Sequence, residues 1–358
     1  MRARSNPSTR GAPLARASSV LMPKDWINFC LTGRCAQDVT EASLSFLMDC
    51  RTRKWSDEMC ALTGVDRALL PDLHAPQDIL GPLLPQVAAE LGLSADIPVL
   101  VGAGDYPLAL TGSGVIAPGM GSDVTGTSTI ITLMHDAPVI DPEISNVLSA
   151  SGAWGAMTLL DAGGDAVRWA RRAFHGNARS YAEIAADAEA ANPGADKLFF
   201  LPYLSGERHH PGSRAQFFGL TAGHGLPELH RAVLEGVALA MRLRLDGLQG
   251  DAGRPERIVA ASGGAKNALW LRIKASMFGV PYLVPEELEC GVVGAAMLMA
   301  TATGDAPDLA HAARRMVRYA HEIAPDPGWA DTYNRMAPVF HRLYHTANDI
   351  YPELDNLP

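Results

Sequence analysis

One stretch of small residues, 99–130, carries the side chains best suited to chemistry. It reads VLVGAGDYPLALTGSGVIAPGMGSDVTGTSTI, so an apolar run ends in glycines and is followed by Asp105. A carboxylate in such a position is able to take a proton from an attacking hydroxyl. The later turn Gly126-Thr127-Ser128 offers the backbone N–H and hydroxyl donors that phosphate needs. The stretch predicts a base at the end of one domain and a phosphate-binding turn at the start of the next.

Two more small-residue turns have the same character. Gly163-Gly164 opens an expected helix, and Gly263-Gly264 follows an expected strand over 257–261. Tight packing between a strand and a helix explains glycines at such places equally well. For Asp105 the alternative is a turn or a helix cap after the strand. The combination of three turns with one carboxylate is therefore stronger than any of its parts.

Several familiar motifs are excluded by single residues. Gly102 and Gly104 imitate a dinucleotide-binding fingerprint, but its third glycine is replaced by Pro107. No glycine is followed by lysine, which excludes a P-loop. The run after Thr125 resembles a serine-hydrolase elbow, but Ile130 stands where that motif requires its last glycine.

Histidines offer two weaker candidates. His341 and His345 are four apart on an expected helix, where they are able to share a metal, but no third ligand is evident. A solvated helix face is the favoured interpretation. His209-His210 lies in a loop rich in glycine and proline, and a ligand contact and an exposed pair explain it equally well.

Composition limits the class of protein. The chain has 358 residues, enough for two domains, with 47% hydrophobic and 19% charged residues and a net charge of 30 − 39 = −9. That charge argues against a broad nucleic-acid surface, and the apolar runs are too short or interrupted to span a bilayer. The five cysteines form no CxxC pair. Reduced thiols and a cytoplasmic location are the resulting expectations.

Short apolar runs predict strands over 97–101, 122–125, 129–134, 154–160, 197–201, 257–261 and 280–284, and the first of them is expected to be buried. Their alternation with helices predicts an α/β architecture. A turn at Pro118-Gly119 predicts the boundary between a first domain over 20–118 and a second over 119–350. Residues 1–19 are rich in arginine and serine and contain no acid. We interpret them as a disordered tail or as residues read from a misplaced start, and an organelle transit peptide is the alternative.

Six stretches, in this order, resemble the FGGY carbohydrate kinases, most closely the xylulokinase-like branch. They are LMPKDWINFCLTG, GAGDYPLALTGSGVIAPG, GTS, FFLPYLSGERHHPGSRAQFFGLT, LHRAVLEGVALAMR and SGGAKNALWLRI. The resemblance implies a two-domain, actin-like ATPase fold of the ribonuclease H-like type. It also implies that sugar lies between the domains and that ATP lies mostly on the second.

The resemblance also assigns roles to residues. Asp105 matches the catalytic base that deprotonates the sugar hydroxyl, and Tyr106 beside it is an expected substrate contact. The implied nucleotide contacts are Gly126, Thr127, Ser128, Gly164, Arg168, Gly263, Gly264 and Asn267. For Glu207-Arg208, a role in orienting sugar and a structural ion pair are both open.

One departure from the family bears on activity. Members begin with an acidic, Gly/Thr-containing hairpin that meets phosphate and Mg²⁺, and no such hairpin precedes the first matching stretch at Val20. The first domain is therefore expected to be incomplete. The expected function is ATP- and Mg²⁺-dependent phosphorylation of a pentulose such as xylulose, with a tetritol or hexulose open. The alternative is an impaired remnant or split subunit that binds nucleotide, a second copy or a complementing N-terminal polypeptide.

Overall fold

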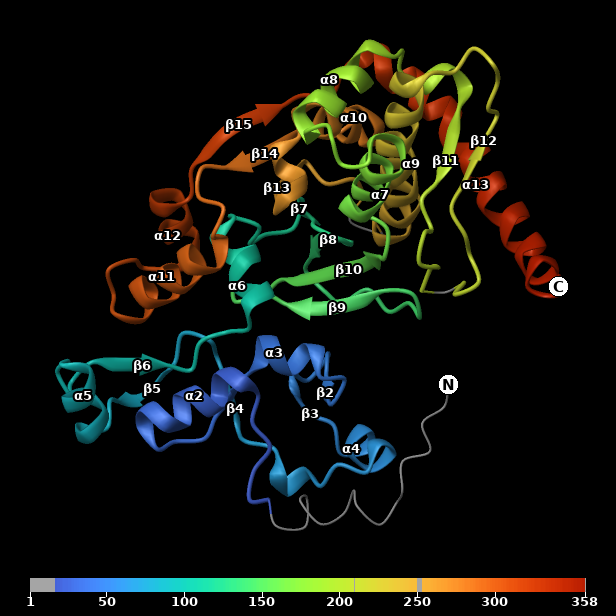
Figure 1. The fold of residues 1–358 in the computed structure, drawn as a ribbon. Helices are drawn as coiled ribbons and strands as arrows, with labels where there is room; N and C mark the ends of the chain where they lie inside the picture. The colour runs from blue at the N-terminus through green and yellow to red at the C-terminus, as the bar shows by residue number, and fades with distance from the viewer. Residues whose placement is uncertain (1–16, 209, 250–252, 358) are drawn as a thin grey trace. The chain divides into compact units, whose positions relative to one another are not determined.

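Two compact units make up the structure, a computed structural model that describes residues 17–208, 210–249 and 253–357 (Figure 1). The first unit holds the described residues up to Thr111 and two returning segments, Val147–Gly152 and Gly291–Arg315. The remaining described residues form the second unit. The chain first passes from the first unit to the second after Thr111, seven residues before the expected boundary at Pro118 (118 − 111 = 7). Most of the expected tail, residues 1–16, lies outside the described residues.

Short elements build the first unit. They are α2 (Pro23–Thr32), β1 (Gln37–Asp38), α3 (Val39–Leu44), β2 (Met48–Asp49), β3 (Lys54–Trp55), α4 (Asp57–Thr63), β4 (Leu73–His74), β5 (Ile79–Pro82), α5 (Pro85–Leu91), β6 (Pro98–Leu100), α6 (Asp105–Gly112), α11 (Cys290–Ala302) and α12 (Leu309–Met316). The strands pair only two at a time, as β1 with β4, β2 with β3 and β5 with β6. Local turns and helix caps therefore fix much of the backbone conformation in this unit.

Helix α2 illustrates how these elements are fixed. Pro23 stands in its first turn and Gly33, at φ +71°, ends it in the left-handed conformation that favours glycine. Its inward face carries the buried polar residues Asp25 and Asn28. The Asn28 Nδ2 group donates to the Val101 carbonyl at 2.8 Å. Helix α2 thus holds the end of β6 through polar contacts.

Strand β6 departs from the expectation of a buried strand over 97–101. It covers Pro98–Leu100, and all three of its residues are half-buried. It pairs antiparallel with β5 in a sheet of two strands. An apolar, β-branched run does not by itself distinguish a strand at the centre of a large sheet from one in a short ribbon.

A seven-stranded mixed sheet forms the centre of the second unit, in the order β15-β14-β13-β7-β8-β10-β9. Strand β7 runs parallel to β13 and antiparallel to β8, and this places the turn after β7 at a sheet edge beside the end of β13. The strands are β7 (Met120–Thr125), β8 (Thr129–His135), β9 (Ser145–Leu148), β10 (Trp154–Leu160), β13 (Arg257–Ala261), β14 (Tyr282–Pro285) and β15 (Tyr319–Ile323). The last two residues of β9 are assigned to the first unit.

Helices α9 (Leu226–Leu248) and α10 (Ala268–Phe278) lie alongside this sheet (Figure 1). The remaining elements of the unit are α7 (Gly164–His175), α8 (Tyr181–Ala190), β11 (Phe199–Leu201), β12 (Gln216–Phe218) and α13 (Pro327–Asp355). Gly236 lets α9 approach β11 closely, because a Cβ atom there would lie 2.1 Å from the Phe200 carbonyl oxygen. One apolar core cluster joins the sheet to α7, α9, α10 and α13.

Two strands begin later than the sequence predicts. The strand expected from Lys197 begins at Phe199, because Ala195, Asp196 and Lys197 form a 3₁₀ turn with positive φ. The strand expected from Val280 begins at Tyr282. None of the helices in the described part of the chain combines the length and the apolar composition of a membrane span. The five cysteines, all in the described part of the chain, form no disulfide bond with one another.

Candidate active site

A cavity of about 700 Å³ in the second unit collects most of the residues predicted to hold a nucleotide. The predicted residues on its wall are Gly126, Thr127, Gly164, Arg168, Gly263, Gly264 and Asn267. They come from three segments far apart in sequence: the β7–β8 turn, the start of α7 and the loop after β13. Ser128 belongs to the same turn but is not part of the wall.

The turn between β7 and β8 is fastened to the start of α7. The Gly126 N–H donates to the Ser128 carbonyl at 2.9 Å, which closes the turn on itself. The N–H groups of Gly164 and Asp165 donate to the carbonyls of Gly126 and Thr127, at 2.8 and 3.1 Å. These bonds use the first amides of α7 for positioning the turn. The Thr127 side chain, at the tip, remains exposed to a ligand.

The two glycines after β13 have different surroundings. A Cβ atom on Gly264 would lie 2.7 Å from Thr125 Cβ and 3.2 Å from the Thr125 carbonyl oxygen. A Cβ atom on Gly263 would meet nothing within 4 Å. Gly264 is therefore needed for close packing of the loop on β7. Gly263 leaves open space on the wall of the cavity.

Gly264→Ala is expected to weaken ATP binding and to lower the melting temperature, because the added methyl group must displace Thr125 on the cavity wall. Overpacking of this kind typically costs about 1–3 kcal/mol. Gly263→Ala is the matched control and is expected to keep the wild-type melting temperature. Calorimetric titration with ATP and thermal unfolding of both variants measure the difference. Equal loss of stability in both variants would contradict the packing argument.

A buried polar network lies directly beneath the turn. Lys274 Nζ is 2.7 Å from Asp123 Oδ2 and donates to Thr125 Oγ1 at 2.9 Å. The Tyr282 hydroxyl donates to Asp123 Oδ2 at 3.1 Å. Burial lowers the pKa of Lys274, and Asp123 opposes this effect. The Lys274 ammonium also lies 4.4 Å from the centre of the Trp270 ring, which forms part of the cavity wall.

The opposite side of the cavity contains residues that sequence analysis missed. Helix α8 contributes Tyr181, Ala182, Ala185, Ala186 and Glu189, and the α10 side adds Lys266, Ala268, Leu269 and Trp270. The alanines recur at helical spacing and present a smooth apolar surface, a pattern that in a sequence is indistinguishable from helix packing. Such a surface suits the flat face of a base.

Two predicted wall residues make local contacts of their own. The Asn267 side chain caps α10 by accepting from the Trp270 N–H at 3.0 Å. Arg168 Nη2 lies 2.5 Å from Asp165 Oδ1, one helical turn away on α7. About half of the Arg168 side chain is exposed. The guanidinium is therefore available at the surface of the cavity.

Asp105 is the first residue of α6, in the first unit, and is exposed. Its Oδ1 atom accepts the backbone N–H of Tyr106 at 2.7 Å. The half-buried residue Tyr106 follows it on the same helix. An exposed carboxylate at a helix start can act both as a proton acceptor and as a local cap.

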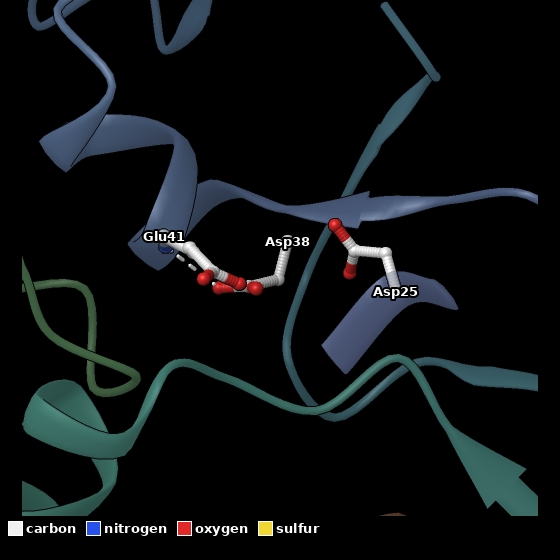
Figure 2. A group of neighbouring side chains, drawn as sticks. All are labelled: Asp25, Asp38 and Glu41. Carbon is white, nitrogen blue, oxygen red and sulfur yellow. Dashed lines mark hydrogen bonds between the residues drawn. The ribbon is translucent and has the colours of Figure 1, made fainter. Parts of the chain in front are cut away.

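Three further carboxylates lie close together near residues 101–104, the segment that leads to Asp105. Asp25 on α2, Asp38 at the end of β1 and Glu41 on α3 turn their oxygens toward one another, with ligand atoms within 4.8 Å (Figure 2). Asp38 Oδ1 accepts the Glu41 N–H at 3.0 Å, as the dashed line shows. Lys24 Nζ already lies among these oxygens, 2.5 Å from Asp25 and 3.1 Å from Asp38. The Lys24 ammonium thus offsets part of the negative charge of the cluster.

Glu41→Gln is expected to raise the melting temperature at pH 8 and to change it much less at pH 5. Burial raises the pKa of Glu41 to about 7, opposed by Lys24 and reinforced by Asp38, Asp25 and Asp105. The folded state therefore binds this proton more tightly than the unfolded state. The associated stability is present below pH 4.5 and is lost as the pH rises through 7. Parallel curves of melting temperature against pH for wild type and variant would contradict this expectation.

The structure also shows the surroundings of the remaining candidates from the sequence, Glu207 and the histidines. Glu207 is buried in the second unit and pairs with Arg244 at 2.6 Å. Glu207 thus takes part in a structural ion pair, one of the two roles that the sequence left open. His341 and His345 are exposed on α13, as expected for a solvated helix face, with Nε2 atoms 3.1 Å apart. His210 is exposed, and His209 lies outside the described residues.

Comparison with known proteins connects these features. The family model for the C-terminal domain of the FGGY carbohydrate kinases matches residues 122–303, and the model for the N-terminal domain matches residues 10–112. The chain belongs to the FGGY family of carbohydrate kinases. The first match contains the cavity and the second contains Asp105.

Individual relatives agree with this assignment. The chain is 34% identical over 267 residues to a xylulose kinase of Escherichia coli, covering 73% of this chain and 54% of the relative. Among solved structures, a ligand-bound xylulose kinase from Lactobacillus acidophilus has a TM-score of 0.90 at 25% identity, covering 97% of this chain and 72% of that one. A gluconate kinase from the same organism has a TM-score of 0.88 at 26% identity, with the same coverage.

These similarities confirm the expected actin-like ATPase fold, which the FGGY kinases share. The chain spans about half the length of the Escherichia coli relative and nearly three quarters of the two solved proteins. The assignment to a kinase family therefore applies to the two domains that the family models match.

Proposed function

We propose that this chain transfers the γ-phosphoryl group of ATP to a hydroxyl group of a sugar or polyol. The observation that carries the proposal is the cavity of the second unit, whose wall includes seven of the eight residues expected to contact nucleotide. Membership of the FGGY family supports the same reaction. Asp105, in the segment matched to the N-terminal family domain, supplies the base.

The proposed chemistry needs one proton transfer and one displacement. An Asp105 carboxylate oxygen accepts the hydroxyl proton, and the sugar oxygen forms a bond to the γ-phosphorus of ATP. The bond from that phosphorus to the bridging oxygen breaks, and ADP leaves with the bond's electron pair. Little covalent chemistry is required of the protein, so positioning and charge stabilisation account for most of the catalysis.

The residues of the cavity fit ATP. The β7–β8 turn offers the Thr127 hydroxyl, Arg168 offers a cation, and Gly263 leaves room for close approach of a ligand. Among the wall residues the only carboxylate is Glu189, which does not make a dedicated metal site. Mg²⁺ would be held mainly by the phosphates of ATP. When bound there, it would neutralise their charge.

The substrate class is proposed from the named relatives. A xylulose kinase and a gluconate kinase resemble the chain closely, which favours a pentulose or a related open-chain sugar or sugar acid. The proposed binding partner is therefore a small-molecule substrate. A nucleotide-binding subunit without turnover is the alternative, as expected if a required segment lies outside this chain.

Purified chain incubated with ATP, Mg²⁺ and a panel of ketopentoses, polyols, hexuloses and sugar acids tests the proposal. Formation of ADP together with a sugar phosphate, detected by mass spectrometry, is the expected result. Saturable ATP binding without a phosphorylated product from any member of the panel would refute the kinase and support the alternative. Calorimetric titration with ATP in the same preparation distinguishes that outcome from a protein that does not bind nucleotide.

A further inference from the structure

The ammonium group of Lys24 makes contacts that the proposed reaction does not use. Its Nζ atom lies 2.5 Å from Asp25 Oδ1, 3.1 Å from Asp38 Oδ2 and 4.0 Å from Glu41 Oε2. It also donates to the Val101 carbonyl at 3.0 Å. Asp25 and Asp38 are fully buried. Three acidic side chains therefore fix one ammonium group, and that group holds the main chain at Val101.

Val101 begins the segment that leads to Asp105, and its neighbours are also held. The N–H groups of Val101 and Gly102 donate to the carbonyls of Asp78 and Pro76, each at 2.9 Å. Gly102 has a φ of +76°. A Cβ atom on Gly102 would lie 3.6 Å from Lys24 Cδ, so the lysine stem covers this glycine. The ammonium and its stem thus contact two consecutive residues of the segment.

The contacts continue up to the carboxylate itself. Ala103 is buried and packs in a cluster with Ala150. Gly104 lies against Glu41, whose Cβ and Cδ atoms would be 3.8 and 3.9 Å from a Cβ at that glycine. Asp105 follows as the first residue of α6. Because the residues between Val101 and Asp105 are held by these contacts, a displacement of Val101 is expected to displace Asp105 as well.

The charges make Lys24 necessary for this arrangement. Burial lowers the pKa of the Lys24 ammonium, but Asp38 and Asp25 raise it more, with a net rise above its ordinary value. Asp38 Oδ2 has the Lys24 ammonium as its ion-pair partner, and Glu41 Oε2 has no hydrogen bond among the described residues. Without the ammonium, three acidic groups would face one another within 4.8 Å and would repel.

We propose that Lys24 is a positioning residue that sets the location of the Asp105 carboxylate by anchoring the segment 101–104. The inference rests on the proposed function in its claim about catalysis, because it assumes that Asp105 is the base. Its claim about the anchored segment rests on geometry alone. The two claims therefore have separate readouts.

Lys24→Met tests both. The kcat for the sugar phosphorylated by wild type is expected to fall about 10²-fold, the order of effect of a misplaced reacting group. The KM for ATP is expected to stay unchanged, because the ATP cavity belongs to the second unit. Amide hydrogen exchange at Val101 and Gly102 is expected to accelerate. Lys24→Arg retains the positive charge and is expected to restore most of kcat.

Lys54→Met is the matched control, since Lys54 is an exposed lysine of β3 in the same unit. A folded Lys24→Met protein with wild-type kcat and wild-type exchange at Val101 would overturn the inference. If that variant does not fold, the double variant Lys24→Met/Glu41→Gln removes one repelling charge and is read in the same way. If wild type phosphorylates no sugar, the proposed function fails, and the exchange rates alone decide whether Lys24 anchors the segment.

Discussion

Asp105→Asn is expected to lower kcat for sugar phosphorylation by about 10²- to 10⁴-fold, the range that a general base contributes. The amide of asparagine cannot accept the hydroxyl proton at neutral pH. Its oxygen can still accept the Tyr106 N–H, which Asp105 Oδ1 accepts at 2.7 Å, so the start of α6 keeps its cap. The exposed position of Asp105 also predicts an unchanged melting temperature.

Steady-state rates with saturating ATP and the best sugar of the panel measure this effect. Asp96→Asn, at another exposed aspartate of the same unit, is the matched control and is expected to keep wild-type kcat. The affinity for ATP is expected to be equal in all three proteins. An Asp105→Asn protein with wild-type kcat would show that Asp105 is not the base. That result would not affect the proposed role of the nucleotide cavity.

Much of the second unit was predictable because its signals are local. The strands over 154–160 and 257–261 have the predicted bounds, since each is a short apolar run between turn residues. The turn at 126–128 and the glycines at 164 and 264 could be recognised for the same reason. Their convergence on one cavity depends on the order of strands in the sheet, and periodicity does not encode that order.

The interactions that hold the site could not be predicted from spacing. Lys274 and Asp123 are 151 residues apart, and their pairing depends on how α10 packs against β7. A lysine within an apolar helical run gives no indication of a partner that distant. Helix α8 was missed because its alanines favour any close packing, with a ligand or with another helix.

The first unit was harder to interpret, since its strands are short and pair only two at a time. The apolar run at 97–101 predicts a buried strand, whereas β6 is half-buried. The role of Lys24 is invisible in sequence, because the acidic groups around it belong to α2, β1 and α3. Such contacts depend on how the short elements pack against one another, which the spacing of residues in the sequence does not specify.

Lys274→Met is expected to destabilise the protein by about 3–5 kcal/mol, the usual cost of removing one partner of a buried ion pair. Lys274 is fully buried and Asp123 is 1% exposed, so the orphaned carboxylate gains no water. Methionine fills most of the volume and keeps an apolar stem beneath Trp270. The loss therefore reflects the charge and its hydrogen bonds rather than a cavity. ATP binding is also expected to weaken, because Thr125 and Trp270 lie on the cavity wall.

Urea denaturation and calorimetric titration with ATP measure the two effects. Lys266→Met, at an exposed lysine of the same cavity, is the matched control and is expected to change stability by no more than about 0.5 kcal/mol. The double variant Asp123→Asn/Lys274→Met removes the orphaned charge and is expected to lose less stability than the two single losses added together. Additive losses would show that the two side chains are not coupled.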